Sequence, residues 1–271
     1  MSTMNLVDAD WLALRGPADD AARSADLAAL AAARLRPGPV VVHDLGSGTG
    51  AMMRWLAPRL PGPQTWVLHD GDPAILAQRD DAPVLDAGGA PVAVETRVEH
   101  LEQLAPRAIQ GASLVTASAL LDVVTLDEAR AIVTACVAVG APALFSLSVT
   151  GRVILDPADD DDPVLAAAFD DHQRREADGR RMLGPDASSA VTALFSIAGW
   201  EVRVDGTPWR LGPGRHALIA EWLDGRVVAA VEQRPDVAAR AAAWHARRAA
   251  QLDAGALRAV VHHEDVLAWP S

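Results

Sequence analysis

The feature that most constrains the fold is a strand, a glycine-rich loop and a helix that follow one another over residues 40–59. Three consecutive valines predict a buried strand, and this strand ends on Asp44. The glycines that follow stand at alternate positions, Gly46, Gly48 and Gly50. Glycine lets the backbone N–H groups of such a loop approach a ligand closely, because no Cβ intervenes. The segment therefore predicts a ligand-binding loop between a strand and a helix of an α/β sheet.

A second strand that ends on an acidic residue follows soon after the first. Trp66, Val67 and Leu68 predict a buried strand over 65–70, and Asp70 closes it. An acidic residue at the end of the second strand of a βαβ unit is placed to accept hydrogen bonds from both ribose hydroxyls. The two segments together predict that the chain binds a cofactor that contains adenosine.

The identity of the cofactor depends on how the glycine loop is interpreted. Gly46 to Ala51 also fit the dinucleotide pattern G-x-G-x-x-A. Asp44 would repel a pyrophosphate, however, and would attract the ammonium group of an amino acid. The Asp-x-Gly-x-Gly-x-Gly pattern with a second acidic strand end resembles the class I S-adenosylmethionine (SAM)-dependent methyltransferases. The resemblance implies SAM as the cofactor, while a nicotinamide oxidoreductase and a chance glycine loop are the alternatives.

The rest of the first half alternates between predicted strands and helices. Residues 8–35 are predicted to be helical, and Pro37, Gly38 and Pro39 end that segment. Such alternation is typical of a parallel sheet with helices on both faces. The further strands are predicted over 40–45, 91–97, 113–118 and 143–149, and the helices over 51–59, 73–78 and 126–139.

The second half departs from this alternation. An acidic insertion with a helix is predicted over 156–186, and its run Asp159–Asp162 is interpreted as a solvated helix-capping loop rather than a metal site. A helix at 186–198, a strand at 200–210, helices at 214–232 and 235–252, and a strand at 256–262 follow. We expect one domain over 1–271, made of a helical cap at 1–38, a SAM-binding half at 39–150 and a substrate half at 151–271.

The resemblance extends beyond the glycine loop. Ser118–Leu121 is similar to the fourth motif of the class I methyltransferases. The later pattern of Glu221, Trp222 and Leu223, between a Trp-Arg strand and two helices, is similar to the trans-aconitate and malonyl-carrier methyltransferase branch. The family resemblance implies an α/β fold with a Rossmann-like, seven-stranded, mostly parallel sheet, helices on both faces, an antiparallel last strand and a helical cap.

The resemblance also assigns residues to the parts of SAM. Asp44 would accept the ammonium group, and Asp70 would bind the ribose hydroxyls. Asp72 has a second interpretation as a helix N-cap before Pro73. The remaining cofactor residues are the loop around the methionine (Gly46, Ser47, Gly48, Gly50), the adenine edge (Gly71, Asp72, Val98, Glu99) and the end of the fourth strand, which would face the methyl group (Thr116, Ala117, Ser118).

Methyl transfer needs a base only if the acceptor must lose a proton. Asp122, just past the fourth strand, and His172, in the insertion, are the two candidates. A loop cap for Asp122 and a solvated helix face for His172 are the competing interpretations. The side chains predicted to bind the acceptor, each with core packing or a surface ion pair as its alternative, are Trp11, Arg15, Arg175 and Trp209.

Composition narrows the chemistry and the partners. The chain has no lysine, which excludes a Schiff base, anchoring of pyridoxal phosphate and a Walker lysine. Its formal net charge of −12 argues against a nucleic acid partner, because proteins that bind nucleic acids usually carry a basic face. The adjacent His262 and His263 would point to opposite faces of a strand, so no metal site is predicted.

The sequence also bounds where the protein works. No apolar run reaches the ~20 residues needed to cross a bilayer, and the N-terminus lacks the basic segment of a secretory signal. The one cysteine, Cys136, fits a reducing compartment and is predicted to be a buried small hydrophobe. We expect a cytoplasmic monomer or homodimer without a membrane partner.

These inferences predict SAM-dependent methyl transfer to a small molecule of specialised metabolism. The acceptor atom is expected to be oxygen, then nitrogen, then carbon. Two alternatives stay open besides the nicotinamide oxidoreductase. One is methyl transfer to a protein or a carrier-bound acyl group, and the other is a SAM-binding regulatory protein without catalysis.

Overall fold

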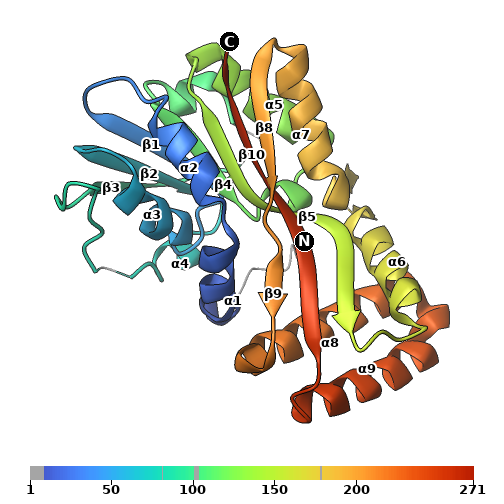
Figure 1. Cartoon of the computed structure of the whole chain (residues 1–271). Coiled ribbons are helices and arrows are strands. Elements are labelled where there is room, and N and C mark those ends of the chain that lie inside the picture. The colour runs from blue at the N-terminus through green and yellow to red at the C-terminus, as the bar shows by residue number, and fades with distance from the viewer. Residues whose placement is uncertain (1–8, 81, 101–103, 178) are drawn as a thin grey trace.

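The computed structural model describes residues 9–80, 82–100, 104–177 and 179–271, and its centre is one mixed sheet (Figure 1). The strands of this sheet are β1 (Val40–Leu45), β2 (Gln64–Asp70), β3 (Ala93–Val98), β4 (Leu114–Ser118), β5 (Ala143–Asp156), β8 (Trp200–Gly206), β9 (Trp209–Leu211) and β10 (Arg258–Pro270). Seven of them lie in the order β3-β2-β1-β4-β5-β10-β8, and β9 pairs with the first residues of β10. The strands β1 to β5 pair in parallel, and β10 runs antiparallel to β5 and β8. The predicted Rossmann-like, mostly parallel sheet with an antiparallel last strand is confirmed, and β9 extends it.

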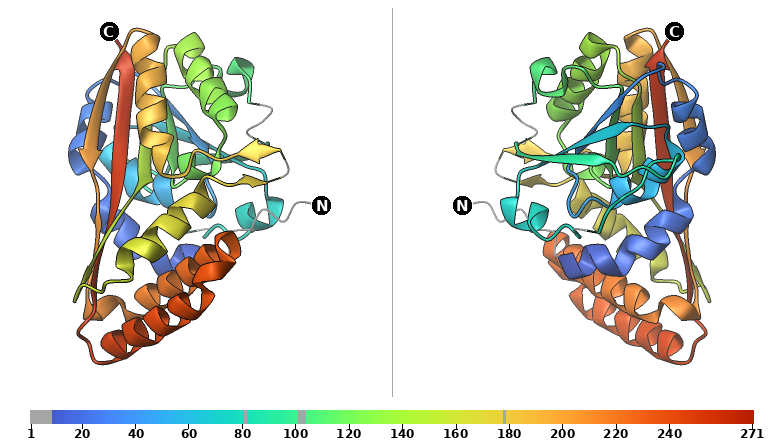
Figure 2. Two further views of the ribbon diagram at one scale, coloured as in Figure 1. Left: turned by 90° about the vertical axis from the view of Figure 1, so that its right-hand side faces the viewer. Right: turned by 90° about the vertical axis from the view of Figure 1, so that its left-hand side faces the viewer.

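Helices cover both faces of the sheet, as Figure 2 shows. The described helices are α1 (Ala9–Ala22), α2 (Ala25–Ala32), α3 (Ala51–Leu56), α4 (Pro73–Leu76), α5 (Leu126–Val139), α6 (Asp162–Gln173), α7 (Ala187–Ile197), α8 (His216–Gln233) and α9 (Ala238–Asp253). Helices α2 and α3 pack on one face, and α5 and α7 pack on the other. Helices α6, α8 and α9 gather below the sheet in Figure 1, and they are called the cap from here on. No helix in the described ranges is long and apolar enough to cross a membrane.

Helix α5 shows how local sequence sets an element's bounds. At its start, the Thr125 hydroxyl accepts a hydrogen bond from the backbone N–H of Glu128, and the Glu128 carboxylate accepts one from the backbone N–H of Thr125. At its end, Gly140 takes a left-handed φ of 68°, which glycine adopts without strain. The prediction of a helix over 126–139 is confirmed at both ends.

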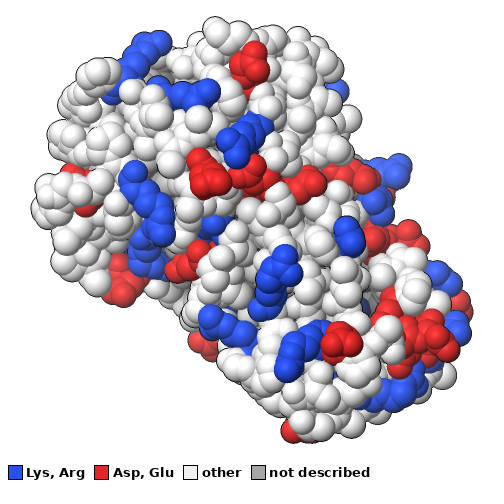
Figure 3. Space-filling model, in the orientation of Figure 1, with Lys and Arg blue, Asp and Glu red and all other residues white. Residues whose placement is uncertain are grey.

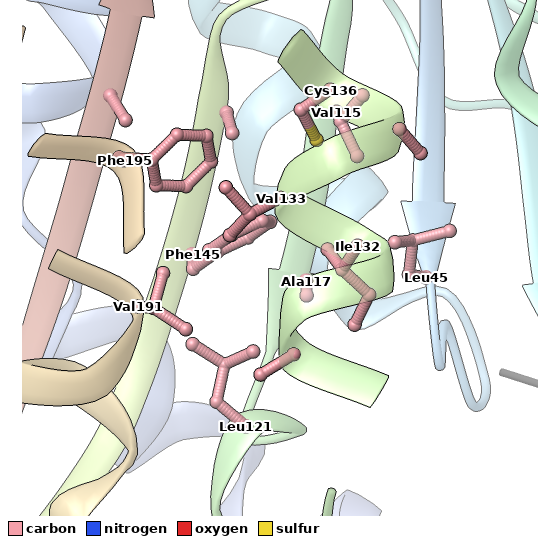
Figure 4. Close-up of a cluster of buried hydrophobic side chains, with 14 of the residues drawn as sticks. Leu45, Val115, Ala117, Leu121, Ile132, Val133, Cys136, Phe145, Val191 and Phe195 are labelled. Carbon is pink, nitrogen blue, oxygen red and sulfur yellow. The ribbon is translucent and has the colours of Figure 1, made fainter. Parts of the chain in front are cut away.

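The core between the sheet and helices α5 and α7 is entirely apolar at its centre (Figure 4). Phe145 of β5 contacts Phe195 of α7, with ring centroids 6.1 Å apart, and Ile132 packs from α5. Cys136 lies in the same layer without solvent exposure, and burial raises the pKa of its thiol to about 12. The prediction that this cysteine is a small hydrophobe is therefore confirmed.

The acidic run at the start of α6 fastens the cap together. Arg247 of α9 donates two hydrogen bonds to the Asp159 carboxylate, at 2.7 and 2.9 Å. Asp162 accepts a hydrogen bond from the Trp244 indole at 2.7 Å and pairs with the buried Arg248. The predicted loop is therefore not merely solvated, because Asp159 and Asp162 bind α9.

Several predicted boundaries were wrong, and each error has a local cause. The single helix expected over 8–35 breaks at Ser24, whose hydroxyl caps α2 by accepting from the N–H of Leu27; residue 8 lies outside the described residues. The strand expected over 200–210 is divided into β8 and β9. The last strand continues to Pro270 rather than 262, because its second half pairs with β5 and β8. The insertion also contains a small hairpin of β6 (Glu176–Ala177) and β7 (Arg180–Arg181).

The buried carboxylate of Asp265 joins three segments that are far apart in the sequence. It accepts hydrogen bonds from the backbone N–H of Leu147 at 2.8 Å, the backbone N–H of Ser24 at 2.9 Å and the Thr207 hydroxyl at 2.8 Å. Leu147 has a φ of 61°, a left-handed conformation that is unusual for leucine. Asp265 therefore holds a bend in β5, the start of α2 and the connection from β8 to β9 at one point.

We predict that Asp265→Ala lowers the free energy of unfolding by roughly 2–5 kcal/mol, because three buried donors lose their acceptor. The measurement is urea denaturation followed by circular dichroism. Asp236→Ala is the matched control, since Asp236 is exposed and pairs only with Arg234 across the surface. Its effect is expected to stay within about 0.5 kcal/mol. Equal stability of the two variants would contradict the role of Asp265.

Candidate functional site

The glycine loop connects β1 to α3 in a conformation that only glycine adopts easily. Gly46, Gly48 and Gly50 have φ values of 59°, 53° and 80°, all in the left-handed region. The backbone N–H of Ser47 donates to the carbonyl of His69 at 3.0 Å and so holds the loop against β2. A Cβ on Gly46 would stand 2.6 Å from Leu120 Cδ1, which is closer than real Cβ contacts. The backbone conformation therefore favours glycine at the first position, and a larger residue there would also displace the Leu120 side chain.

Asp44 is the second-last residue of β1, just before this loop. The carboxyl group is buried, and its Oδ1 accepts a hydrogen bond from the Thr116 hydroxyl at 2.7 Å. The other oxygen, Oδ2, has no hydrogen-bond partner among the described residues. Burial raises the pKa of Asp44 to about 6, and the hydrogen bond from Thr116 and the charge of Arg23 oppose this rise. A buried carboxylate with an unpartnered oxygen is suited to a cationic ligand.

Arg23 lies close to Asp44 and presents the opposite charge. It is 5% exposed, and its Nη2 donates to the Ser118 hydroxyl at 3.1 Å while its Nη1 pairs with Asp20 at 2.5 Å. Its Nε has no hydrogen-bond partner in the described parts of the chain. Burial lowers the pKa of Arg23 despite the acidic groups around it. The site therefore holds one unpartnered anionic atom and one unpartnered cationic atom, the complement of a zwitterionic amino acid.

Sequence reasoning did not assign Arg23 to this position. It stands between two predicted turns of an alanine-rich helix, far in sequence from β1 and β4. Its neighbour Ser24 caps α2 and bonds to Asp265, and this pairing brings Arg23 over the sheet. No periodic or motif signal around residue 23 carries that information, because it depends on a contact with residue 265.

Asp70 lies at the end of β2, as predicted, and it braces the glycine loop. Its Oδ2 accepts from the backbone N–H of Gly48 at 2.8 Å, and its Oδ1 accepts from the backbone N–H of Asp72 at 3.0 Å. A carboxylate oxygen can accept a second hydrogen bond, so both oxygens retain acceptor capacity for ribose hydroxyls. Asp72 caps α4 by accepting from the N–H of Ala74 at 2.8 Å, which supports its interpretation as an N-cap. Gly71 packs against His100, whose Nδ1 would be 2.8 Å from an added Cβ.

The end of β3 contributes Val98, which is 57% exposed, and Glu99. The Glu99 carboxylate accepts a hydrogen bond from Nδ1 of the buried His69 at 3.0 Å. His69 Nε2 lies 2.9 Å from Nδ1 of His43, and burial lowers the pKa of both rings. One Glu99 oxygen is thus used within the protein, and its predicted contact with adenine stays a prediction.

The end of β4 meets the glycine loop from the other side. Thr116 bonds to Asp44, and Ser118 accepts from Arg23, so two of the three residues predicted here hold the charged pair. Ala117 is buried in the core beneath them. The chain then turns sharply at Ala119, which has a φ of 52°. This turn carries Leu120 against Gly46 and Asp122 into a neighbouring cavity.

That cavity has a volume of about 230 Å³ and lies between β5, β10, α1 and the cap. Three residues predicted to act on the acceptor line it, Trp11, Arg15 and Trp209, and so does the candidate base Asp122. The Asp122 Oδ1 is buried without a partner among the described residues, and burial raises the pKa of this carboxyl to about 6. This cavity is called the acceptor pocket below.

Two predicted residues do not reach the acceptor pocket. His172 is buried between α6 and α8, where its Nε2 donates to Glu232 at 3.2 Å and its Nδ1 accepts from Arg175 at 3.0 Å. Burial lowers the pKa of His172. The arrangement gives neither residue a contact with the pocket, because α6 turns its neighbours Phe169 and Gln173 toward it instead.

His262 and His263 were not proposed as pocket residues, yet both line it. Alternation along a regular strand would separate them. The pairing of β10 with β5 shifts register between Val261 and His263, which marks an irregularity in the strand. His263 is buried against Trp209, and burial lowers the pKa of its ring to about 3. No group of three or more potential metal ligands occurs among the described residues.

Comparison with known proteins supports the fold. No protein-family model and no curated protein matches the sequence. The cyclopropane synthase MmaA2 from Mycobacterium tuberculosis superposes with a TM-score of 0.52 over 97% of this chain and 94% of that one, at 15% identity. A putative type II methyltransferase from Anaeromyxobacter dehalogenans gives a TM-score of 0.52 over 92% and 98%, at 16% identity. The chain shares their fold.

We predict that the stability difference between the wild type and Asp44→Asn depends on pH. The raised pKa means that the folded protein holds this proton more tightly than the unfolded chain does. The stabilisation is complete below the unfolded pKa of 3.8 and is lost as pH rises through about 6. Between about pH 4 and pH 7, wild type should lose on the order of 2–3 kcal/mol relative to Asp44→Asn. Urea denaturation at stepped pH measures this, and a constant difference would contradict it.

Proposed function

We propose that the chain binds SAM on the glycine loop and transfers its methyl group to a small molecule in the acceptor pocket. The observation that carries this proposal is the pair of unpartnered, buried, oppositely charged atoms beside the loop, Asp44 Oδ2 and Arg23 Nε. They match the ammonium and carboxylate of the methionine part of SAM. A dinucleotide carries no such ammonium group, and its pyrophosphate would meet Asp44.

The remaining residues of the site fit the rest of SAM. The three glycines between Gly46 and Gly50 carry no Cβ, so the cofactor can approach the loop backbone closely at these positions. Asp70 can still accept hydrogen bonds from the ribose hydroxyls. The fold likeness to a protein described as a putative methyltransferase agrees with this assignment. When bound, SAM supplies a methyl carbon whose bond to sulfur breaks as an acceptor lone pair bonds to it, which leaves the electron pair on a neutral thioether.

The side chains of the acceptor pocket would orient the acceptor, and one of them would accept its proton. Alignment of the two reacting atoms can supply several kcal/mol of the barrier. Asp122 lines the pocket, with an unpartnered Oδ1 that can accept the proton of a hydroxyl or amine. A pKa near 6 places this group close to the value that suits a base at neutral pH. Oxygen is the expected acceptor atom, followed by nitrogen and carbon.

The alternatives fit the molecule less well. A regulatory SAM-binding protein does not need a second pocket with a buried carboxyl in its lining. A nucleic acid partner needs a basic surface. On the face shown in Figure 3, arginine side chains are scattered among acidic ones. Transfer to a small molecule is therefore favoured over transfer to a nucleic acid.

Calorimetric titration with SAM, S-adenosylhomocysteine and NADH tests the cofactor assignment. Both adenosyl compounds are expected to bind with dissociation constants of about micromolar order, and NADH to give no binding heat. Asp44→Asn should bind both compounds less tightly, because their common ammonium group loses its charged acceptor. Binding of NADH alone would overturn the proposal.

A matched pair of glycine variants tests where the cofactor binds. Gly46→Ala should weaken SAM binding by at least about tenfold, because alanine is strained at this left-handed position and its Cβ crowds Leu120 within the loop that would hold the cofactor. Gly89→Ala is the control, since Gly89 has a φ of 83° but nothing within 4 Å of an added Cβ. Both variants share the strain of alanine in a left-handed conformation. A difference in SAM affinity between them therefore reports the effect of the glycine loop itself. Unchanged SAM binding by a folded Gly46→Ala protein would place the cofactor elsewhere.

A further inference from the structure

Arg226 is a buried charge with no hydrogen bond or ion pair to any residue that the structure describes. It lies on α8 and is 6% exposed. Its guanidinium carbon stands 4.2 Å from the ring centroid of Phe169 and 4.9 Å from that of Trp222. No described residue forms a hydrogen bond or ion pair with it, although its side chain lines the acceptor pocket. Burial lowers the pKa of Arg226 to about 10, so the group is still charged at neutral pH. A buried cation without a bonded partner is costly unless a ligand completes it.

Asp170 is the acidic residue that faces Arg226 in the pocket, but it accepts no hydrogen bond from the guanidinium group. The two interact through space, but no hydrogen bond joins them. The Asp170 carboxylate lies against Gly151, where an added Cβ would stand 2.6 Å from Oδ2, and its Oδ1 is buried without a partner among the described residues. The donors of Arg226 are therefore free for an anion.

The other arginines of the pocket are differently placed. Arg15 donates two hydrogen bonds to Asp19, at 2.8 and 3.2 Å, and its charge is neutralised there. Arg152 is exposed at the rim. Arg226 is thus the buried cation that a ligand inside the pocket would meet.

The shape and lining of the pocket restrict the rest of the ligand. At ~30 Å³ of liquid per water, the volume of about 230 Å³ corresponds to about eight waters, which suits one ring with a few substituents. Trp11, Trp209 and Phe169 provide flat aromatic walls, and Val149 and Val261 add aliphatic ones. Such walls favour a planar ring over a flexible chain.

The two polar ends of the pocket come from different elements. Arg226 belongs to the cap helix α8, whereas Asp122 follows β4 in the turn that also carries Leu120 against Gly46 of the glycine loop. A ligand that satisfies both carries an anionic group at one end and a proton donor at the other. The planar guanidinium fork matches a carboxylate better than it matches other anions of this size.

We propose that the methyl acceptor is a small aromatic carboxylic acid, whose carboxylate binds Arg226 and whose hydroxyl or amine lies at Asp122. The carboxylate is the anchor, and the hydroxyl or amine is the acceptor. The role of this acid as the methyl acceptor rests on the proposed function. The binding of its carboxylate by Arg226 does not, because it is a property of the pocket alone.

The experiment compares acids with their uncharged amides. Benzoate, 4-hydroxybenzoate and anthranilate are each titrated against the corresponding amide, with tryptophan fluorescence and calorimetry as readouts. The tryptophans of the pocket report the binding directly. Wild type should bind at least one acid about tenfold or more tightly than its amide, because a charged hydrogen bond is lost in the amide.

Arginine variants assign that preference to one side chain. Arg226→Met should bind acid and amide equally, and Arg226→Lys should keep only part of the preference because the fork is lost. Arg130→Met is the control, since Arg130 is exposed on α5 and pairs only with Asp127. It should behave as wild type. If Arg226→Met does not fold, the wild-type comparison and Arg226→Lys decide the matter.

Each outcome bears on the proposal. Equal affinity of wild type for every acid and its amide, or no binding of any acid up to about 10 mM, would overturn it. An acid preference that survives in folded Arg226→Met would also overturn it. SAM binding without an acid preference removes this inference and leaves the proposed function. An Arg226-dependent acid preference without SAM binding removes the proposed function and leaves an acid-binding pocket.

Discussion

The structure depends on the three hydrogen bonds that converge on the buried carboxylate of Asp265. One of them fixes Ser24, and this places Arg23 beside Asp44 and the glycine loop. Another fixes Leu147 in its left-handed conformation, where β5 begins to line the acceptor pocket. The third fixes the connection that leads to β9. The proposed cofactor end and the proposed acceptor end of the site are therefore connected through the same side chain, although their residues are far apart in the sequence.

Local sequence patterns predicted the parts of the site that are built locally. The left-handed glycines and Asp70 follow buried strands directly, so the strand pattern locates them. Asp122 was predicted because it follows β4. Arg23 and Arg226 could not be located, because their positions depend on how α1 and α8 pack against the sheet. His172 was misplaced for a related reason: the periodicity of α6 does not tell which of its faces meets the pocket.

Arginine provides the side-chain cations of this protein, and several of these arginines stack on tryptophan rings. The chain has neither lysine nor tyrosine. Guanidinium groups stack on indole rings at several sites, with Arg34 standing 3.8 Å from the ring centroid of Trp269 and Arg23 standing 5.7 Å from that of Trp55. A guanidinium is weakly hydrated and planar, so it can be buried against a ring and still carry its charge. This explains how an acidic protein places cations at two buried positions of its site.

The continuity of β5 and β10 limits how the cap can move relative to the sheet. Both strands run unbroken from the sheet into the cap and pair with each other along the way, from Arg258 opposite Asp156 to Ala268 opposite Ala143. The cap therefore cannot move away from the sheet without breaking hydrogen bonds between β5 and β10. Helix α1 lines the pocket with Trp11 and Arg15, and the hydrogen bond from the Trp209 indole to Asp19 joins this helix to β9. A widening of the pocket on the α1 side would have to break this one hydrogen bond, whereas a widening on the cap side would have to break several.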